Sequence, residues 1–146
     1  MSAYLDTHVT LWLYVGETAR ISKRAAALIN KEALLASPVV LLELQYLREI
    51  GRLATTPHAV IAELKRRIGL AIQNRPLEAI VEQAQDLEWT RDVFDRLIVA
   101  QATLDGAAPA RVGNASARLR ALPPLVATAR SSISAPGRVW RGACSG

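Results

Sequence analysis

The chain has 146 residues, of which 51% are hydrophobic, and it carries a formal net charge of +5 at pH 7. This length and apolar content predict one globular domain with a sizeable core, and a single cysteine excludes a scaffold stapled by disulfides. No apolar run approaches the roughly 20 residues of a membrane span, and the N-terminus lacks the basic flank and cleavage site of a signal peptide. We therefore expect a cytoplasmic protein with no membrane partner.

The basic charge is concentrated in the C-terminal part of the sequence. Residues 1–105 contain all 13 acids and 12 of the 18 basic residues, a net charge of −1, whereas residues 106–146 contain no acid. The six arginines of this second part are Arg111, Arg118, Arg120, Arg130, Arg138 and Arg141. Such a composition indicates a solvated or poorly ordered segment. An arm that contacts nucleic-acid phosphates is the alternative, although Trp140 is its one aromatic residue and provides no stacking platform.

Apolar runs and capping signals predict alternating short strands and longer helices. In chain order they are a strand at 1–5, helices at 9–14 and 23–31, a strand at 33–36, helices at 39–50 and 57–68, a strand at 70–72, and helices at 77–87 and 92–104. Ser22, Ser37 and Thr56 are good N-caps, and Pro38 and Pro57 suit the first helical position. Glycines close four of the helices: Gly16, Gly51, Gly69 and Gly106.

This alternation predicts an α/β fold with a central parallel sheet covered by helices on both faces. Right-handed crossovers would bring the carboxyl ends of the strands to one edge of the sheet. There is no internal repeat and no Gly-rich phosphate loop. The composition changes after Gly106, so we expect a core domain at residues 1–106 and a basic tail rich in Ala, Arg, Pro and Ser at residues 107–146, with no further strand.

Four acids lie where the carboxyl edge of such a sheet would gather them. Asp6 ends the first strand, Glu43 lies inside a leucine-rich helix, and Asp92 and Asp95 begin the last predicted helix. Periodicity does not decide whether Glu43 points to solvent or into the protein. Asp92 is also an ideal N-cap, and Asp95 would then lie at the third helical position, where negative charge favours the helix dipole. The apolar run around Asp95 favours a side chain that faces a polar pocket.

The chemistry that gathers carboxylates is metal-assisted hydrolysis of phosphodiesters. Several carboxylates hold one or two Mg²⁺ or Mn²⁺ ions, which activate a water molecule and neutralise charge on the leaving oxygen. Spacing along the sequence does not matter for this, because the sheet edge brings the acids together. His8 is a candidate general base, but a lone histidine in the first turn of a helix favours a structural or solvated role.

Three segments resemble the PIN-domain ribonucleases, in particular the VapC-type toxins of toxin–antitoxin pairs. They are YLDTH at residues 4–8, SPVVLLEL at 37–44 and RDVFDRLIVAQA at 91–102, and the last is the most specific. The order and spacing of the three segments over residues 1–106 strengthen the resemblance. It implies a PIN-like α/β/α sandwich with a central parallel sheet and an acidic pocket that binds Mg²⁺ or Mn²⁺.

Carried over position by position, the resemblance implies that Asp6, Glu43 and Asp95 are the catalytic and metal-binding acids. Asp92 matches a further acid found in the subgroup with this run, and Thr7 matches the hydroxyl beside the first acid. The implied activity is that of a metal-dependent endoribonuclease toxin of a type II toxin–antitoxin system, which hydrolyses RNA with a metal-activated water. The implied partners are an RNA substrate, a cognate VapB-type antitoxin and a second copy of the chain.

The sequence departs from the family pattern after Gly106, where the family has a strand and then a further acid. Asn114 or Ser116 fall in this region, and neither brings a negative charge to an ion. The alternative is therefore a degenerate, catalytically weak PIN-fold protein that still binds an antitoxin or a dimer partner. We hypothesise that residues 107–146 are a frameshifted or otherwise degenerated end of an ordinary toxin. Resequencing that finds one uninterrupted frame of ancestral length, with a tail that folds into the sheet, would contradict this.

Overall fold

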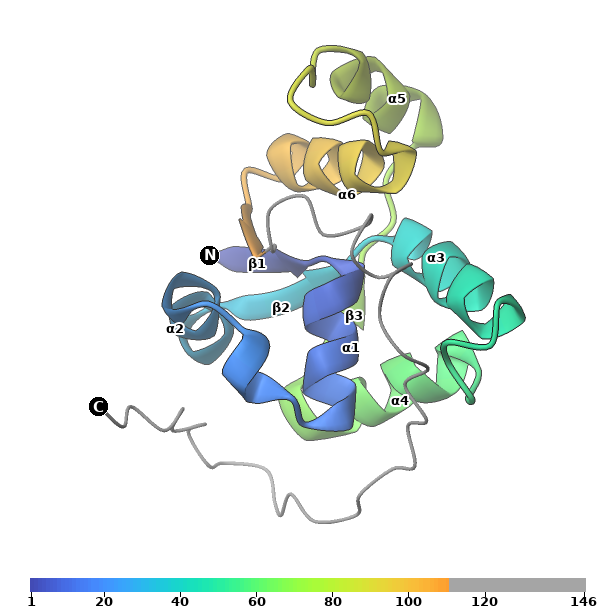
Figure 1. The fold of residues 1–146 in the computed structure, drawn as a ribbon. Coiled ribbons are helices and arrows are strands. Elements are labelled where there is room, and N and C mark those ends of the chain that lie inside the picture. The colour runs from blue at the N-terminus through green and yellow to red at the C-terminus, as the bar shows by residue number, and fades with distance from the viewer. Residues whose placement is uncertain (111–146) are drawn as a thin grey trace.

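A computed structural model gives the fold of residues 1–110 (Figure 1). The tail that the sequence predicts lies, from residue 111 onward, outside the described residues. The elements in chain order are β1 (Ser2–Leu5), α1 (Thr7–Val15), the 3-10 helix η1 (Thr18–Arg20), α2 (Lys23–Lys31), β2 (Ala33–Ala36), α3 (Pro38–Glu49), α4 (Pro57–Ile68), β3 (Ala71–Ile72), α5 (Leu77–Gln85), α6 (Val93–Leu104) and β4 (Ala108–Ala110). Each predicted strand and helix is present, with its ends shifted by at most two residues.

The expectation that no strand follows Gly106 is wrong. Residues 108–110 form β4, which pairs in parallel with β1 so that Tyr4 lies opposite Pro109. Proline lacks a backbone N–H, but a strand at the end of the described sheet pairs on one side only and tolerates it. Three residues with a central proline carry no periodic pattern, so pairing with β1, and not local sequence, produces this strand.

The strands form a parallel sheet in the order β3-β2-β1-β4. The chain adds strands in one direction from β1 through β3 and then crosses to the other side of β1. This reversal makes the carboxyl end of β1 the topological switch point of the sheet, the place where open α/β folds bind ligands. Asp6 follows β1 directly at this point.

Helices cover both faces of the sheet (Figure 1). Helix α6, with α5 outside it, lies on one face, and α1 and α4 lie on the other, while α3 packs against both α4 and α6. This is the α/β/α arrangement that the sequence predicts. None of the helices in the described part of the chain combines the length and apolar character that crossing a bilayer requires.

Strand β1 sends alternate side chains to the two faces. Ala3 and Leu5 are fully buried in the main apolar cluster, which also contains Val9 of α1 and Leu64 of α4. Tyr4, between them, is directed to α6 instead, where its hydroxyl meets polar side chains. Because side chains alternate along a strand, Ala3 and Leu5 pack in the apolar layer with α1 and α4, whereas Tyr4 makes its polar contacts with α6.

Candidate active site

Asp6 is fixed at the junction of β1 and α1. It is the N-cap of α1, and its Oδ1 accepts a hydrogen bond of 2.8 Å from the backbone N–H of Val9. The side chain is only 5% exposed. The sequence predicted Asp6 at the strand end but missed its role as a cap, which ties one carboxylate oxygen to the start of the helix.

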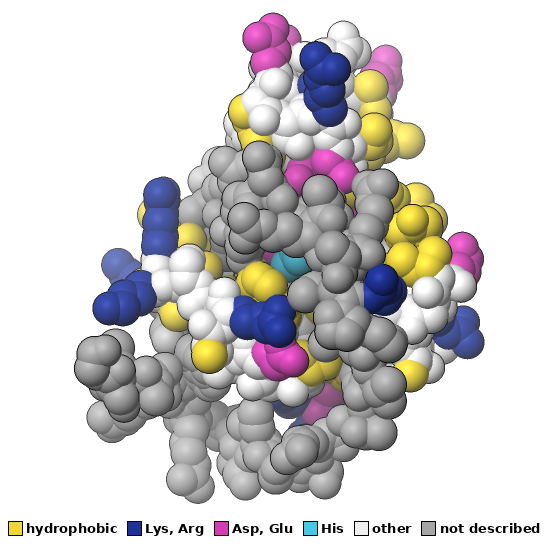
Figure 2. Space-filling view, viewed as in Figure 1, with side chains coloured by type: hydrophobic (Ala, Val, Ile, Leu, Met, Phe, Trp, Pro, Cys, Tyr) yellow, Lys and Arg dark blue, Asp and Glu magenta, His cyan; other side chains and the backbone are white. Residues whose placement is uncertain are grey.

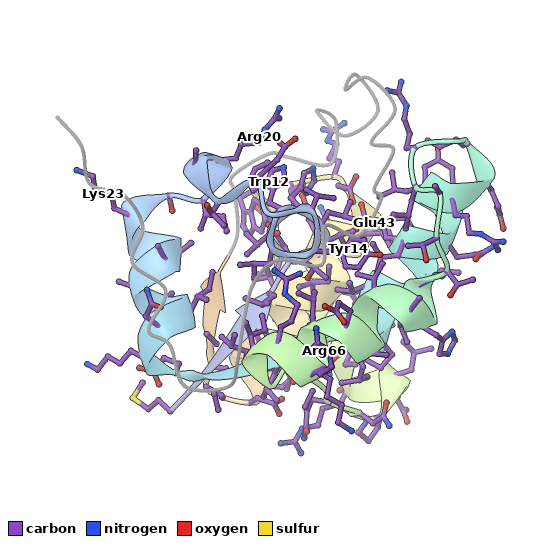
Figure 3. All side chains as sticks on the ribbon, turned by 90° about the horizontal axis from the view of Figure 1, so that it is seen from below. Trp12, Tyr14, Arg20, Lys23, Glu43 and Arg66 are labelled. Atoms are coloured by element: carbon purple, nitrogen blue, oxygen red, sulfur yellow. The ribbon has the colours of Figure 1, made fainter. Side chains whose placement is uncertain are left out.

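Glu43 lies in the second turn of α3 and is buried, with 5% of its surface exposed. The alternative of a solvent-facing Glu43 is therefore wrong. Its side chain shares the buried face of α3 with Val40, Leu44 and Leu47, and its Oε2 accepts a hydrogen bond from the hydroxyl of Thr7. In Figure 3, which looks along α1, Glu43 lies on the side of α3 that faces α1.

Asp92 and Asp95 begin α6. Asp92 caps the helix, and its Oδ1 accepts the backbone N–H groups of Phe94 at 3.0 Å and of Asp95 at 3.2 Å. The capping role predicted for Asp92 is thus confirmed. Asp95 lies in the first turn, and both side chains are partly buried. The same hydrogen bonds that start α6 orient the carboxylate of Asp92.

The pKa of Glu43 depends on the charges of the other three acids. Burial, above all, and the negative charges of Asp92, Asp95 and Asp6 raise the pKa of Glu43 from 4.5 to about 7, while the hydrogen bond from Thr7 opposes the rise. The effect of a charge on a pKa falls with distance and is larger in a medium of low dielectric constant. The charges of all three aspartates therefore act on Glu43 in addition to the larger effect of its burial.

This donor set fits a hard divalent cation by type and by charge. Carboxylate oxygens are the preferred protein ligands of Mg²⁺, and a buried carboxylate repelled by its neighbours gains from a cation beside it. Among residues whose side chains the structure describes, no three His, Cys, Asp or Glu side chains are arranged as a metal-binding group. The fit thus depends on the chemistry of the donors, and their spacing does not add to it.

His8 has a packing role. It is 2% exposed and contacts Trp12 edge to face, with the ring centroids 5.9 Å apart. This contact joins neighbouring turns of α1, in keeping with the structural interpretation of a lone histidine in a first helical turn.

Sequence reasoning missed a buried polar network beside the acids, centred on Gln101 of α6. Its Oε1 accepts a hydrogen bond of 2.6 Å from the hydroxyl of Ser37, and its Nε2 donates to the backbone carbonyl of Gln73 and, at 3.3 Å, to the hydroxyl of Tyr4. The Tyr4 hydroxyl in turn donates to Asp105. The available signal was one long polar side chain within the apolar stretch of α6.

A protein-family model, the PIN domain, matches residues 3–112 of the chain. The match includes the described sheet apart from Ser2, and the segments that carry Asp6, Glu43, Asp92 and Asp95. No curated protein matches the chain.

Proposed function

The chain belongs to the PIN domain family, and we propose that it is a metal-dependent endoribonuclease, the VapC-type toxin of a type II toxin–antitoxin pair, acting in the cytoplasm. PIN domains are typically nucleases, which supports a hydrolase that acts on nucleic acid. One observation carries the finer proposal: the charges of Asp6, Asp92 and Asp95 all act on the buried carboxylate of Glu43. Such a concentration of negative charge suits a cation and disfavours direct binding of a phosphodiester without one.

In this proposal Asp6, Glu43 and Asp95 hold Mg²⁺ or Mn²⁺, and Asp92 supports them. The ion, when bound, supplies an activated water and neutralises charge on the leaving oxygen. The chain's own contribution is to orient the acids. The N–H of Val9 anchors Asp6, and the hydroxyl of Thr7 anchors Glu43.

An exposed apolar surface supports the proposed protein partners, a second copy of the chain and a VapB-type antitoxin. Leu42 and Tyr46 of α3 and Ile50, the C-cap of this helix, are spaced four residues apart and are 63%, 40% and 42% exposed. This spacing places them along one side of the helix. Leu77 and Val81 of α5 are exposed as well, and Figure 2 shows hydrophobic side chains gathered along this flank, over α3 and α5. Large exposed apolar patches mark interaction surfaces.

The proposed catalytic unit runs from residue 1 to Gly106, because all four acids and the helices that carry them precede this glycine. Strand β4 then completes the described sheet. The basic segment, with its six arginines, follows as a separate region of the sequence.

A catalytically weak PIN protein that only binds a partner is the second candidate. It is favoured by the sequence after Gly106, which contains no acid and has Asn114 or Ser116 in the region where the family has a further acid. A site with fewer carboxylates holds a divalent ion less tightly. Under this alternative the exposed apolar surface of α3 and α5 is retained while RNA cleavage is lost.

Cleavage of RNA by the purified full chain separates the two candidates. Asp6→Asn removes the charge while an asparagine oxygen can still cap α1, and Glu82→Gln on the exposed side of α5 is the matched control. We expect cleavage that requires Mg²⁺ or Mn²⁺, stops with chelator, falls by roughly 100-fold or more in Asp6→Asn, and persists in Glu82→Gln. Equal and negligible cleavage by all three proteins would overturn the enzyme proposal and leave the binding protein as the remaining candidate.

A further inference from the structure

Gln101 connects the three chain segments that carry the acids. Ser37, which donates to its Oε1, is the N-cap of α3, the helix that holds Glu43. Tyr4, whose hydroxyl accepts from its Nε2, lies on β1 two residues before Asp6. Gln101 itself belongs to α6, the helix that begins with Asp95 in its first turn. The side chain of Gln101 thus links β1, the start of α3 and α6, the three elements next to the acids or carrying them.

Both polar atoms of the Gln101 side-chain amide are hydrogen-bonded. It is 0% exposed, its oxygen accepts from Ser37, and its nitrogen donates to Gln73 and Tyr4. Buried amides with every group paired have one permitted orientation. The partners are fixed in turn, because Tyr4 also donates to Asp105, which is paired with Arg75.

Apolar packing and hydrogen bonds together hold α6 against the sheet. The buried apolar residues of the helix are Ile98, which belongs to the main apolar cluster, and the small Ala100 and Ala102. Apolar burial is non-directional, whereas hydrogen bonds depend on distance and angle and weaken as donor and acceptor move apart. The Gln101 network therefore adds a directional constraint on the position of α6 relative to β1 and to the start of α3.

We propose that Gln101 is a positioning residue of the acidic centre, which fixes the start of α6 relative to Asp6 and Glu43. Gln101 is six residues from Asp95, roughly 9 Å along the helix axis at 1.5 Å per residue. Any shift of α6 at Gln101 is transmitted to Asp95, since a helix of this length moves as a rigid rod. Misplacement of a catalytic group by about 1 Å lowers a rate by about 100-fold. This inference rests on the proposed metal-dependent function.

Gln101→Met tests the proposal, because methionine keeps the length and volume of the side chain and removes its hydrogen bonds. Val60→Ala is the matched control: Val60 is also 0% exposed but belongs to α4, on the other face of the sheet. For the full chain, Mn²⁺ affinity is measured by calorimetry, and kcat and KM are measured on a single-stranded RNA oligonucleotide. All assays are run below the unfolding midpoint of every variant.

We expect Gln101→Met to weaken Mn²⁺ binding about 10-fold and to lower kcat about 100-fold, with KM nearly unchanged. Val60→Ala loses stability yet keeps the wild-type Mn²⁺ affinity and kcat. Tyr4→Phe, which removes the hydrogen bond from Gln101 to Tyr4 and the one from Tyr4 to Asp105, changes Mn²⁺ affinity in the same direction by a smaller factor. This variant also decides the matter if Gln101→Met fails to fold.

Three results overturn the proposal. Mn²⁺ affinity and kcat in Gln101→Met or Tyr4→Phe that match Val60→Ala would make the network a part of the scaffold only. A rise in KM at constant kcat would place its effect on RNA binding. A wild-type chain that neither binds Mn²⁺ nor cleaves RNA would end the proposed function and this inference with it, and it is distinguishable because the wild type itself is then inactive.

Discussion

Replacing Glu43 by glutamine should stabilise the metal-free protein at neutral and alkaline pH. Burial and three neighbouring aspartates raise the pKa of Glu43 from 4.5 in the unfolded chain to about 7 in the fold. Below pH 4.5 the group is protonated in both states and costs nothing. Between pH 4.5 and 7 the folded state keeps a proton that the unfolded state has released, so the free energy of unfolding falls as pH rises.

The magnitude follows from the size of the rise in pKa. At 1.36 kcal/mol for each pKa unit, the buried charge costs the wild type about 3 kcal/mol above pH 7. Glutamine carries no charge, and its oxygen can still accept the hydroxyl of Thr7 in place of the Glu43 carboxylate. We therefore expect Glu43→Gln to exceed the wild type by about 2–3 kcal/mol at pH 8 and by little at pH 4.5.

Urea unfolding in the presence of chelator at pH 4.5, 6, 7 and 8 measures this difference. The matched control is Glu49→Gln, an exposed acid of the same helix, which should follow the wild-type profile. Only the difference between variant and wild type is informative, because other groups titrate in the same range. Parallel profiles for the wild type and Glu43→Gln would refute the reasoning that Glu43 bears the repulsion.

Adding Mn²⁺ at pH 8 should reverse the order of stability. Ligand that binds only the folded state contributes about 4.1 kcal/mol at 1,000 times its dissociation constant, which exceeds the advantage of about 2–3 kcal/mol expected for Glu43→Gln. The ionised Glu43 is the form that a cation favours. The wild type should gain this stabilisation, while Glu43→Gln should gain little. Equal gains in both proteins would remove Glu43 from the metal site.

Substitutions at two further positions test how the fold supports the site. Asp92→Ala should lower the free energy of unfolding by about 1 kcal/mol because the helix cap is lost, whereas Asp92→Asn should leave the free energy of unfolding unchanged. Both variants should show less metal-dependent cleavage. An Asp92→Asn protein that cleaves RNA like the wild type would show that Asp92 acts only as a helix cap. Arg67 of α4 donates hydrogen bonds to the backbone carbonyls of Leu13 and Tyr14 at 3.1 Å each. Arg67→Met should therefore lower the free energy of unfolding, measured in urea, by roughly 1.5–3 kcal/mol. An unchanged urea midpoint would show that water replaces both hydrogen bonds.

Local signals explain why the elements could be predicted from the sequence. Ser22, Ser37 and Thr56 each accept the backbone N–H that an N-cap requires, at 3.2 Å in every case. These interactions need only three or four residues of chain. Strand β4 could not be predicted in the same way, because its stability comes from pairing with β1, about 100 residues earlier.

The acids of the candidate site could be predicted from the sequence, but the burial of Glu43 and the hydrogen-bond network around Gln101 could not. On α3 the apolar Leu42 is 63% exposed and the acid Glu43 is 5% exposed, the reverse of what hydrophobicity predicts. The packing of α3 against α4 and α6 decides this, and no local pattern contains it. Gln101 was missed for the same reason, since its three partners come from segments that only the fold brings together.

The three aspartates and Glu43 are held in different ways. Asp6 and Asp92 accept backbone N–H groups at the starts of α1 and α6, where the helix dipole favours negative charge. Asp95, in the first turn of α6, lies in the same favourable field. Glu43 lies deeper in its own helix and accepts a hydrogen bond only from Thr7 among the bonds described. A cation that enters this edge of the sheet therefore gains most beside Glu43, so proton release from Glu43 and ion binding should be linked.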